Sequence, residues 1–541
     1  MATDQSPIDP LDAGTKYEEA EHLSDPMLTR RRLLETAAAA GIAVGSAGFL
    51  GSPARAAEFA LAATPKRGGR LRIGMVGGGS SETLDPNLAV STIDTCRVLT
   101  LYDLLVHAKP DLSLEMRLAT AFEPNRNATK WTIKLRKGVV WHNGKPFGAD
   151  DVMYTLRRIA ASKTNGALPA VQPFNLKGMR KVNAHEFELP LHVPIADLAP
   201  AFVFYPMVIV QDGWKNFKKP VGTGAFMADQ FKPSRGSLFK RNPHYWMHGL
   251  PYVDELEISS IPDPQARLNA LLSGQVHAVE QLSFAQAKEH QQKKDIVVLV
   301  GNGPQFVPIT MSVDLKPFND VRVRQAFRLI ADRPALIKSA QFGYGQLGND
   351  LVGRGLKWYD NQLPQRHQDI DKAKFLLKKA GAEHLNVTLY SSTAIAGMLE
   401  SANVFAQQAR KAGVKINVNN GPPDTYFASK YLKWAFGQTN WPAIPIPIWI
   451  NEAATTKAFY NETHWKRPSF DGLVLKAQAE QNEARAQELW NEVQKILWDQ
   501  GGYLIWGFAP FIDGVSKRVK GVVPSGVFAL GNFDFQHFWL A

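Results

Sequence analysis

The sequence predicts an α/β protein with more than one domain. Strand-like and helix-like segments alternate along most of the chain, without a detectable internal repeat. A length of 541 residues is more than one ordinary hydrophobic core supports, and it indicates two or three domains. Apolar residues make up 45% of the chain and charged residues 21%, which is the composition of a soluble globular protein.

Individual elements are expected from periodicity and from turn and capping signals. Alternating apolar residues from Trp131, followed by an Asn-Gly turn, predict a pair of strands over residues 131–142. Asp263 fits a helix N-cap, Pro264 fits the first helical position and Gly274 fits the stop. By the same reasoning, helices are expected at 150–159, 265–273, 371–380 and 483–500, and further strands at 71–76, 386–390 and 415–418.

Residues 1–56 are expected to be an export signal with a disordered, acidic leader. The arginines at 30–32 follow Thr29 and precede an apolar run from Thr36 to Gly51, and residues 54–56 offer a small-x-small cleavage pattern. The adjacent arginines resemble the twin-arginine class of signal. The mature protein, starting near Ala57 or Ala63, is therefore expected in a periplasmic or extracellular space.

Cysteine content and charge narrow the class of protein further. Cys96 is the single cysteine, so no intramolecular disulfide is possible; we expect a buried, inert thiol and no lipid attachment at the cleavage site. The chain has a net charge of +12, and residues 1–56 carry −3, which leaves about +15 on the mature part. Its basic residues are scattered among acidic ones, which favours a basic surface facing acidic envelope polymers or lipid headgroups over nucleic-acid binding.

The sequence predicts no catalytic, metal-binding or cofactor-binding residues. Residues 138–145 resemble a phosphate loop, but five residues instead of four separate the glycines and Pro146 replaces the Ser or Thr, so a hairpin turn is expected. His244 and His248 are four residues apart, yet the flanking proline and glycine leave no helix to align them on a metal. The mature chain lacks both G-x-S-x-G and H-E-x-x-H, so it is not expected to be an enzyme.

Aromatic residues give the clearest indication of a ligand site. Trp434, Trp441, Trp449 and Trp465 lie close together in the sequence, and residues 438–449 contain three prolines. The prolines argue against a helix or a central strand and predict a rigid aromatic loop that forms a pocket wall. The alternative is that the individual rings fill a hydrophobic core.

Seven segments in a fixed order resemble the family 5 solute-binding proteins of bacterial ABC importers, the oligopeptide, dipeptide and nickel-binding type. They read GGRLRIG (68–74), TLDP (83–86), KLRKGVVWHNGKPF (134–147), DDV (150–152), PVGTGAF (220–226), RNPHYW (241–246) and NDVRVRQAF (319–327). The resemblance extends from about residue 66 to about 540. It implies a monomer that captures a peptide or other small organic solute and delivers it to ABC permease subunits, which work with separate ATPase subunits.

The resemblance also implies a domain plan. The fold would be a bilobed α/β periplasmic-binding-protein-like fold (type II, cluster C). Lobe I would comprise residues 66–303, with an extra subdomain inserted at about 105–218 and a C-terminal return at 506–541. Lobe II would comprise residues 304–505, and a solute would close the two lobes together.

Departures from the family pattern bear on the ligand. Peptide-binding members carry an Asp in the loop that matches 437–445, and dipeptide binders carry an Arg near 390–397, but this chain has neither. An unpaired buried charge costs several kcal/mol, so we expect a longer peptide or a neutral or aromatic solute instead of a zwitterionic dipeptide. The residues expected to bind it are Phe306, Ser392, Tyr426, Trp434, Thr439, Asn440 and Trp441.

Three other functions stay open at the level of sequence. An exported hydrolase would need a nucleophile paired with a base, and none is recognisable. A chemosensory binding protein would share the fold but work without a transporter. An envelope scaffold would bind acidic polymers through the charge of the mature chain, and salt would weaken that binding.

Overall fold

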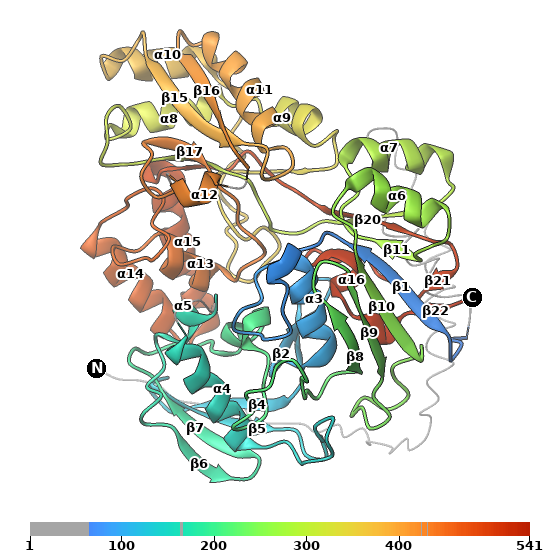
Figure 1. Ribbon diagram of the computed structural model, residues 1–541. Coiled ribbons are helices and arrows are strands. Elements are labelled where there is room, and N and C mark those ends of the chain that lie inside the picture. Colours follow the sequence, from blue (N-terminus) through green and yellow to red (C-terminus); the bar gives the residue numbers. More distant parts are fainter. Residues whose placement is uncertain (1–63, 163–165, 424, 430) are drawn as a thin grey trace, which may run out of the picture. The chain divides into compact units, whose positions relative to one another are not determined.

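The computed structural model describes residues 64–541 except 163–165, 424 and 430 (Figure 1). These residues belong to one compact unit. The expected export signal over 1–56, and both expected starts of the mature chain, Ala57 and Ala63, lie outside the described residues. Within the described part of the chain, none of the helices has the combined length and apolarity that a bilayer crossing requires.

A seven-stranded mixed sheet organises the first large core, in the order β12-β20-β11-β1-β10-β9-β8. Its strands are β1 (Arg70–Met75), β8 (Phe226–Lys232), β9 (Gly236–Arg241), β10 (Glu255–Ser260), β11 (Ala278–Val279), β12 (Val297–Gly301) and β20 (Phe511–Val515). β1 is parallel to β10 and β11, and it buries Leu71 and Ile73 completely. Helices α3 (Thr92–Leu101), α6 (Pro264–Leu272), α7 (Phe284–Lys293) and α16 (Ala529–Asn532) pack on this sheet.

A five-stranded sheet organises the second core, in the order β16-β15-β17-β13-β18. Its strands are β13 (Ile309–Met311), β15 (Asn386–Ser392), β16 (Lys415–Gly421), β17 (Phe436–Gln438) and β18 (Tyr503–Leu504). Four helices, α8 (Val321–Ile330), α9 (Arg333–Ala340), α10 (Ile370–Lys379) and α11 (Met398–Arg410), pack against the sheet or against each other. Their apolar faces share one buried cluster, which includes Phe327 and Phe405.

A smaller, four-stranded antiparallel sheet lies between β1 and β8 in chain order. It runs β4-β5-β7-β6 and consists of β4 (Ala119–Pro124), β5 (Lys130–Leu135), β6 (Arg180–Asn183) and β7 (Glu186–Pro190). Helix α4 (Ala149–Ala161) contacts β6, and α5 (Leu168–Val171) contacts α4. The hairpin of β2 (Val106–Ala108) and β3 (Leu114–Met116) precedes this sheet.

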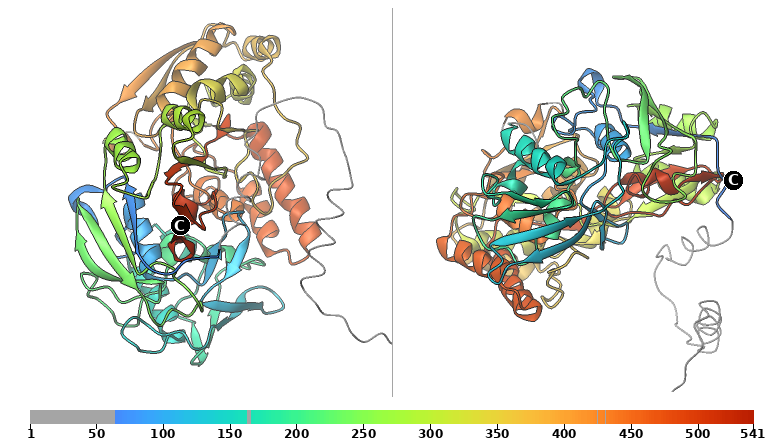
Figure 2. Two further views of the ribbon diagram at one scale, coloured as in Figure 1. Left: turned by 90° about the vertical axis from the view of Figure 1, so that its right-hand side faces the viewer. Right: turned by 90° about the horizontal axis from the view of Figure 1, so that it is seen from below.

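Three further helices follow β17 and contribute to the candidate site. They are α13 (Ile446–Ala453), α14 (Pro468–Ala479) and α15 (Glu483–Gln500), and α14 runs beside α15 (Figures 1 and 2). A separate aromatic cluster under them includes Trp449, Trp465 and Trp490. The remaining elements are short: α12 (Tyr426–Ser429), β14 (Gln346–Leu347), β19 (Gly507–Phe508), β21 (Val519–Lys520) and β22 (Trp539–Leu540).

Capping signals predicted several helices correctly. Asp263 caps α6 by accepting a hydrogen bond from the Ala266 amide at 2.7 Å, and Pro264 occupies the first position. Helix α15 spans residues 483–500 as expected, capped by Asn482. Cys96 is buried as expected, and burial raises the pKa of its thiol.

The expected strand pair over residues 131–142 is wrong in its second half. β5 ends at Leu135 and pairs with β4 and β7 instead of with the following residues. Gly138 and Gly144 adopt φ values of +78° and +80°, and these turns break the extended run, so that Val140 forms only an isolated bridge with Pro146.

The expectation that residues 438–449 exclude a helix is wrong at the end of this segment. α13 begins at Ile446 with Pro447 in its first turn, where no amide donor is needed.

Asp350 is a buried charge that ties together segments far apart in sequence. Its Oδ2 accepts from Arg333 Nη2 at 2.7 Å and pairs with Arg366, while its Oδ1 accepts from the Ile505 amide at 2.9 Å. Burial alone would raise the pKa of Asp350, but the two guanidinium groups outweigh it and hold the pKa below its usual value. The folded state therefore depends on this carboxylate being ionised.

We expect Asp350→Asn to lower the free energy of unfolding by about 3–5 kcal/mol, because it leaves two guanidinium groups without their counter-charge. Urea denaturation measures the change. The loss should shrink as the pH falls through the depressed pKa of Asp350, where the native carboxylate also becomes neutral. Glu488→Gln, at an exposed position in α15, is the control and should stay within about 0.5 kcal/mol of the parent. Equal effects of the two substitutions would contradict the role given to Asp350.

Candidate functional site

The residues expected to bind a ligand divide between two buried aromatic clusters. Phe306 and Trp441 belong to one cluster, and their backbones exchange two hydrogen bonds of 3.0 and 2.9 Å. Tyr426 and Trp434 belong to the other, where their rings stack with centroids 5.3 Å apart. The structure therefore brings these residues together in pairs, not around one open pocket.

Trp441 is held by a buried carboxylate. Its indole Nε1 donates to Glu462 Oε2 at 3.0 Å, and the hydroxyls of Tyr503 and Tyr431 donate to the two oxygens of Glu462 at 2.6 Å each. Burial raises the pKa of Glu462, and these donors only partly oppose that effect. With 5% of its surface exposed, Trp441 serves the packing and the hydrogen-bond network of the aromatic cluster.

Protein partners also occupy the polar atoms of several other expected residues. Trp434 Nε1 donates to Thr310 Oγ1 at 3.1 Å, and Ser392 Oγ donates to the carbonyl oxygen of Gly421 at 3.0 Å. The Tyr426 hydroxyl lies 2.8 Å from the carbonyl oxygen of Gln438. Thr439 is buried, whereas Asn440 is exposed to solvent.

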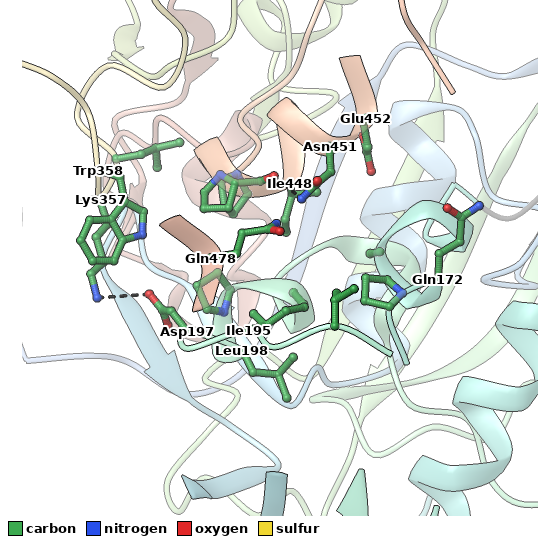
Figure 3. Close-up of a pocket in the computed structure, with 18 of the residues that line it drawn as sticks. Gln172, Ile195, Asp197, Leu198, Lys357, Trp358, Ile448, Asn451, Glu452 and Gln478 are labelled. Atoms are coloured by element: carbon green, nitrogen blue, oxygen red, sulfur yellow. Dashed lines mark hydrogen bonds and ion pairs between the residues drawn. The ribbon is translucent and has the colours of Figure 1, made fainter. Parts of the chain in front are cut away.

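A cavity of about 800 Å³ lies elsewhere, between two groups of segments (Figure 3). One group comes from the part of the chain around the four-stranded sheet, and the other comes from residue 355 onward. The first group consists of residues within 111–114, 170–174 and 192–201, and the second of residues within 355–358, 445–459 and 475–478. None of the seven residues expected to bind a ligand is among the described residues that line it.

The cavity wall is largely apolar. Leu356, Trp358, Phe174 and Ile448 contribute buried or half-buried side chains, and Phe459 contributes a ring that is 66% exposed. Polar and charged side chains, among them His192, Asn451 and Gln478, also line the cavity. Its volume lies within the range of small-molecule pockets, roughly 300–1,000 Å³.

Direct contacts join the two sides of the cavity. Lys357 Nζ pairs with Asp197 Oδ2 at 3.1 Å, as the dashed line in Figure 3 shows, and also lies 4.4 Å from the ring centre of Trp358. The Ala196 amide donates to the carbonyl oxygen of Gln478 at 2.7 Å. These contacts link the segment 192–201 to residues beyond 355.

The proline-containing segment does reach the cavity, through residues that the sequence did not single out. Pro445 and Pro447 line it, and α13 then presents Ile448, Asn451 and Glu452 on the same side. The spacing i, i+3, i+4 of these three residues is the signal that a helical reading of the segment would have found. Phe459 and Trp358 carried no distinguishing signal in the sequence.

Glu452 is the most unusual group in the cavity wall. Only 6% of its surface is exposed, and desolvation raises the pKa of its carboxyl to about 7. Its side chain has no hydrogen-bond or ion-pair partner in the described part of the chain. No group of three or more His, Cys, Asp or Glu residues that could hold a metal occurs among the described residues.

Two sheet-centred cores and an apolar cavity between chain segments define a bilobed binding protein, and comparison with known proteins agrees with this class. Residues 113–487 match the profile described as "Bacterial extracellular solute-binding proteins, family 5 Middle". The chain therefore belongs to the family 5 bacterial extracellular solute-binding proteins, as the sequence resemblance predicted.

Named relatives cover nearly the whole length of the described chain. The glutathione-binding protein GsiB of Escherichia coli O6:K15:H31 (strain 536 / UPEC) is 23% identical over 85% of this chain and 93% of its own. The dipeptide-binding protein of Escherichia coli (strain K12) is 26% identical over 85% and 92%. The fold matches the periplasmic binding protein DppA from Helicobacter pylori, solved with the peptide STSA, with a TM-score of 0.74 at 20% identity over 88% and 98% of the two chains.

We expect Trp441→Phe to lower the free energy of unfolding by about 1–3 kcal/mol, because it removes one donor from buried Glu462 and leaves a small void. Solute affinity should stay within about twofold, since the ring lies outside the lining of the cavity. Urea denaturation and calorimetric titration measure the two quantities. Weaker binding with unchanged stability would instead place Trp441 in the ligand site.

Proposed function

We propose that the protein captures a small organic solute or short peptide in the 800 Å³ cavity and delivers it, chemically unchanged, to an ABC permease. The observation that carries this proposal is the cavity itself, whose surface is mostly apolar and which is lined from two separate groups of segments. Family membership supports the same function, and the named relatives bind glutathione and dipeptides.

Binding without chemistry accounts for the polar groups of the cavity better than hydrolysis does. Ser113 and His192 both line it, but the Ser113 hydroxyl donates to Asp111 Oδ1 at 2.5 Å. This hydrogen bond holds the pKa of Asp111 below its usual value, so the carboxylate is a poor base for activating a serine nucleophile. The protein is accordingly a binder and not an enzyme, and energy for import comes from separate ATPase subunits.

The sheets support a division into two lobes with an inserted subdomain. Residues 66–303 form lobe I, with the inserted subdomain at about 105–218 containing the four-stranded sheet. Lobe II starts at 304 and contains the five-stranded sheet. Lobe II ends at about 505, and residues 506–541 return to lobe I, where β20 joins the seven-stranded sheet. The pairing of β19 with β14 favours a crossing a few residues later, after Phe508.

Export by the twin-arginine route places this binder outside the cytoplasm. The arginines at 30–32 and the absence of a cysteine at the cleavage site support a mature protein that is secreted without a lipid anchor. A monomer is sufficient for the mechanism, because one chain supplies both sides of the cavity. Solute bound across the two sides favours the closed arrangement, which the permease recognises.

The decisive experiment starts from protein purified from its source, with native mass spectrometry to identify the co-purified solute. Small-angle scattering of protein stripped of that solute should show a larger radius of gyration than the loaded protein. The recovered solute should be chemically identical to the solute added. A conversion product, or scattering curves that do not respond to the solute, would refute this function.

Phe459→Ala should weaken binding of the recovered solute by about 1–3 kcal/mol, because the exposed ring is a ready contact surface in the cavity wall. Phe375→Ala is the matched control, since Phe375 is similarly exposed, at 57%, on α10 and away from the cavity. Calorimetric titration gives both affinities, and thermal unfolding checks that both variants stay folded. Equal affinities for the two variants would exclude Phe459 from the site.

A further inference from the structure

Glu452 stands at the junction of two cavities. It lines the 800 Å³ cavity and also a smaller adjoining space of about 50 Å³ behind Leu112, Leu356 and Ile448. In Figure 3 its carboxylate points away from α13, toward the side of the cavity that carries Gln172. The group is therefore buried against protein on most sides and open to the cavity on one.

The smaller space is apolar apart from this one group. Its lining includes Val203, Phe204, Val527 and Phe528, and among the described residues around it Glu452 is the one polar side chain. An apolar space beside a single buried carboxylate matches a ligand that carries an apolar portion next to a charged nitrogen.

No lysine, arginine or histidine among the described residues forms an ion pair with Glu452. Burial raises the pKa of its carboxyl. Lys357, a cation of the cavity, pairs with Asp197 and Glu483, and Lys457 is exposed. Two other buried carboxylates differ: Asp350 has two guanidinium groups, and Glu462 has four side-chain donors.

We propose that Glu452 binds a cationic nitrogen of the solute, an ammonium or guanidinium group, with the adjoining apolar part of the solute in the small cavity. This inference rests on the proposed function and adds the chemical class of the ligand. It differs from the expectation of a longer peptide or a neutral or aromatic solute, which followed in part from the lack of an acidic residue in the loop 437–445. The acidic residue proposed here, Glu452, lies in α13, the helix that follows this loop.

The charge state of Glu452 makes binding depend on pH. Below about pH 7 its carboxyl is protonated in the free protein, and a bound cation favours the ionised form, so the affinity for a cation should rise as the pH rises through 7. Other titratable groups around the same space are Asp111, His192, Asp197, Lys357, Lys457 and Tyr460. Substitution of Glu452 separates its contribution from theirs.

The test uses two matched probes, 3-phenylpropylamine and 3-phenylpropan-1-ol, which differ in charge but share an apolar body. Titration calorimetry at pH 8 should show that the parent protein prefers the amine by roughly 10- to 100-fold, the range for a hydrogen bond between charged partners. Glu452→Gln should bring the two affinities to within about threefold and remove the rise with pH. Because this variant replaces a desolvated charge by an isosteric amide, it should fold normally, which thermal unfolding verifies.

Asp111→Asn is the matched control, since it removes the exposed carboxylate at the same cavity and should keep the preference for the amine. The inference is overturned if the parent binds both probes equally or binds neither. It is also overturned if Glu452→Gln keeps the preference, or if Asp111→Asn alone removes it.

The titrations, together with the scattering experiment, distinguish a failure of the cation site from a failure of the proposed solute capture. If the amine binds through Glu452 but scattering stays unchanged with every bound solute, capture by closure fails while the cation site stands. If a neutral solute contracts the protein and Glu452→Gln binds it normally, capture stands and the cation site fails.

Discussion

The burial of carboxylates is the constraint on which this structure most depends. An ionised acid removed from water is tolerated only where donors or cations replace the lost hydration. Asp350 receives two guanidinium groups and a backbone amide, and it thereby joins α9, Arg366 and Ile505, the residue that follows β18. Glu462 receives three hydroxyls and an indole, and it thereby fixes Trp441. Glu452 receives no comparable partner from the described residues, and it is the one of the three that faces the large cavity.

Helix α13 connects the aromatic core to the cavity. Trp449 and Ile450 on its inner side are buried, and the Trp449 ring lies 5.1 Å from Tyr503 and 5.8 Å from Trp441. Ile448 and Glu452 on its other side face the cavity. The aromatic cluster is thus the rigid support that positions the cavity wall, which explains why rings expected at a ligand lie one layer behind it.

Local signals in the sequence were sufficient for much of the fold. An N-cap acid followed by proline specified the start of α6, and Gly501 specified the end of α15, because such signals act within a few residues. The order of seven short motifs gave the family and hence the bilobed fold. The strand after Leu135 was mistaken because two glycines with positive φ reverse the chain, and alternating apolar residues do not reveal that reversal.

The site was less accessible to the same reasoning. Whether a tryptophan faces a ligand or a core depends on contacts such as that between Trp441 and Glu462, which join residues 21 positions apart in sequence. Treating residues 438–449 as a loop hid the helical spacing that places Ile448 and Glu452 on one face. In the sequence, Glu452 is only the next acidic residue after the loop 437–445, and nothing marks it as a ligand residue. Its burial in the cavity wall, which raises the pKa of its carboxyl, appears only in the structure.

Two polar contacts that join the sides of the cavity are individually weak. Under the proposed function, a bound solute can therefore shift the balance between open and closed arrangements. The pair of Lys357 with Asp197 is half-exposed, and such pairs contribute only about 0–1 kcal/mol. The hydrogen bond from the Ala196 amide to Gln478 adds about 0.5–1.5 kcal/mol. A solute that places its charge on Glu452 and apolar surface against Trp358 and Phe459 gains these interactions only where both sides meet it. Under the proposed function, a solute that gains these interactions only in the closed arrangement shifts the population toward it.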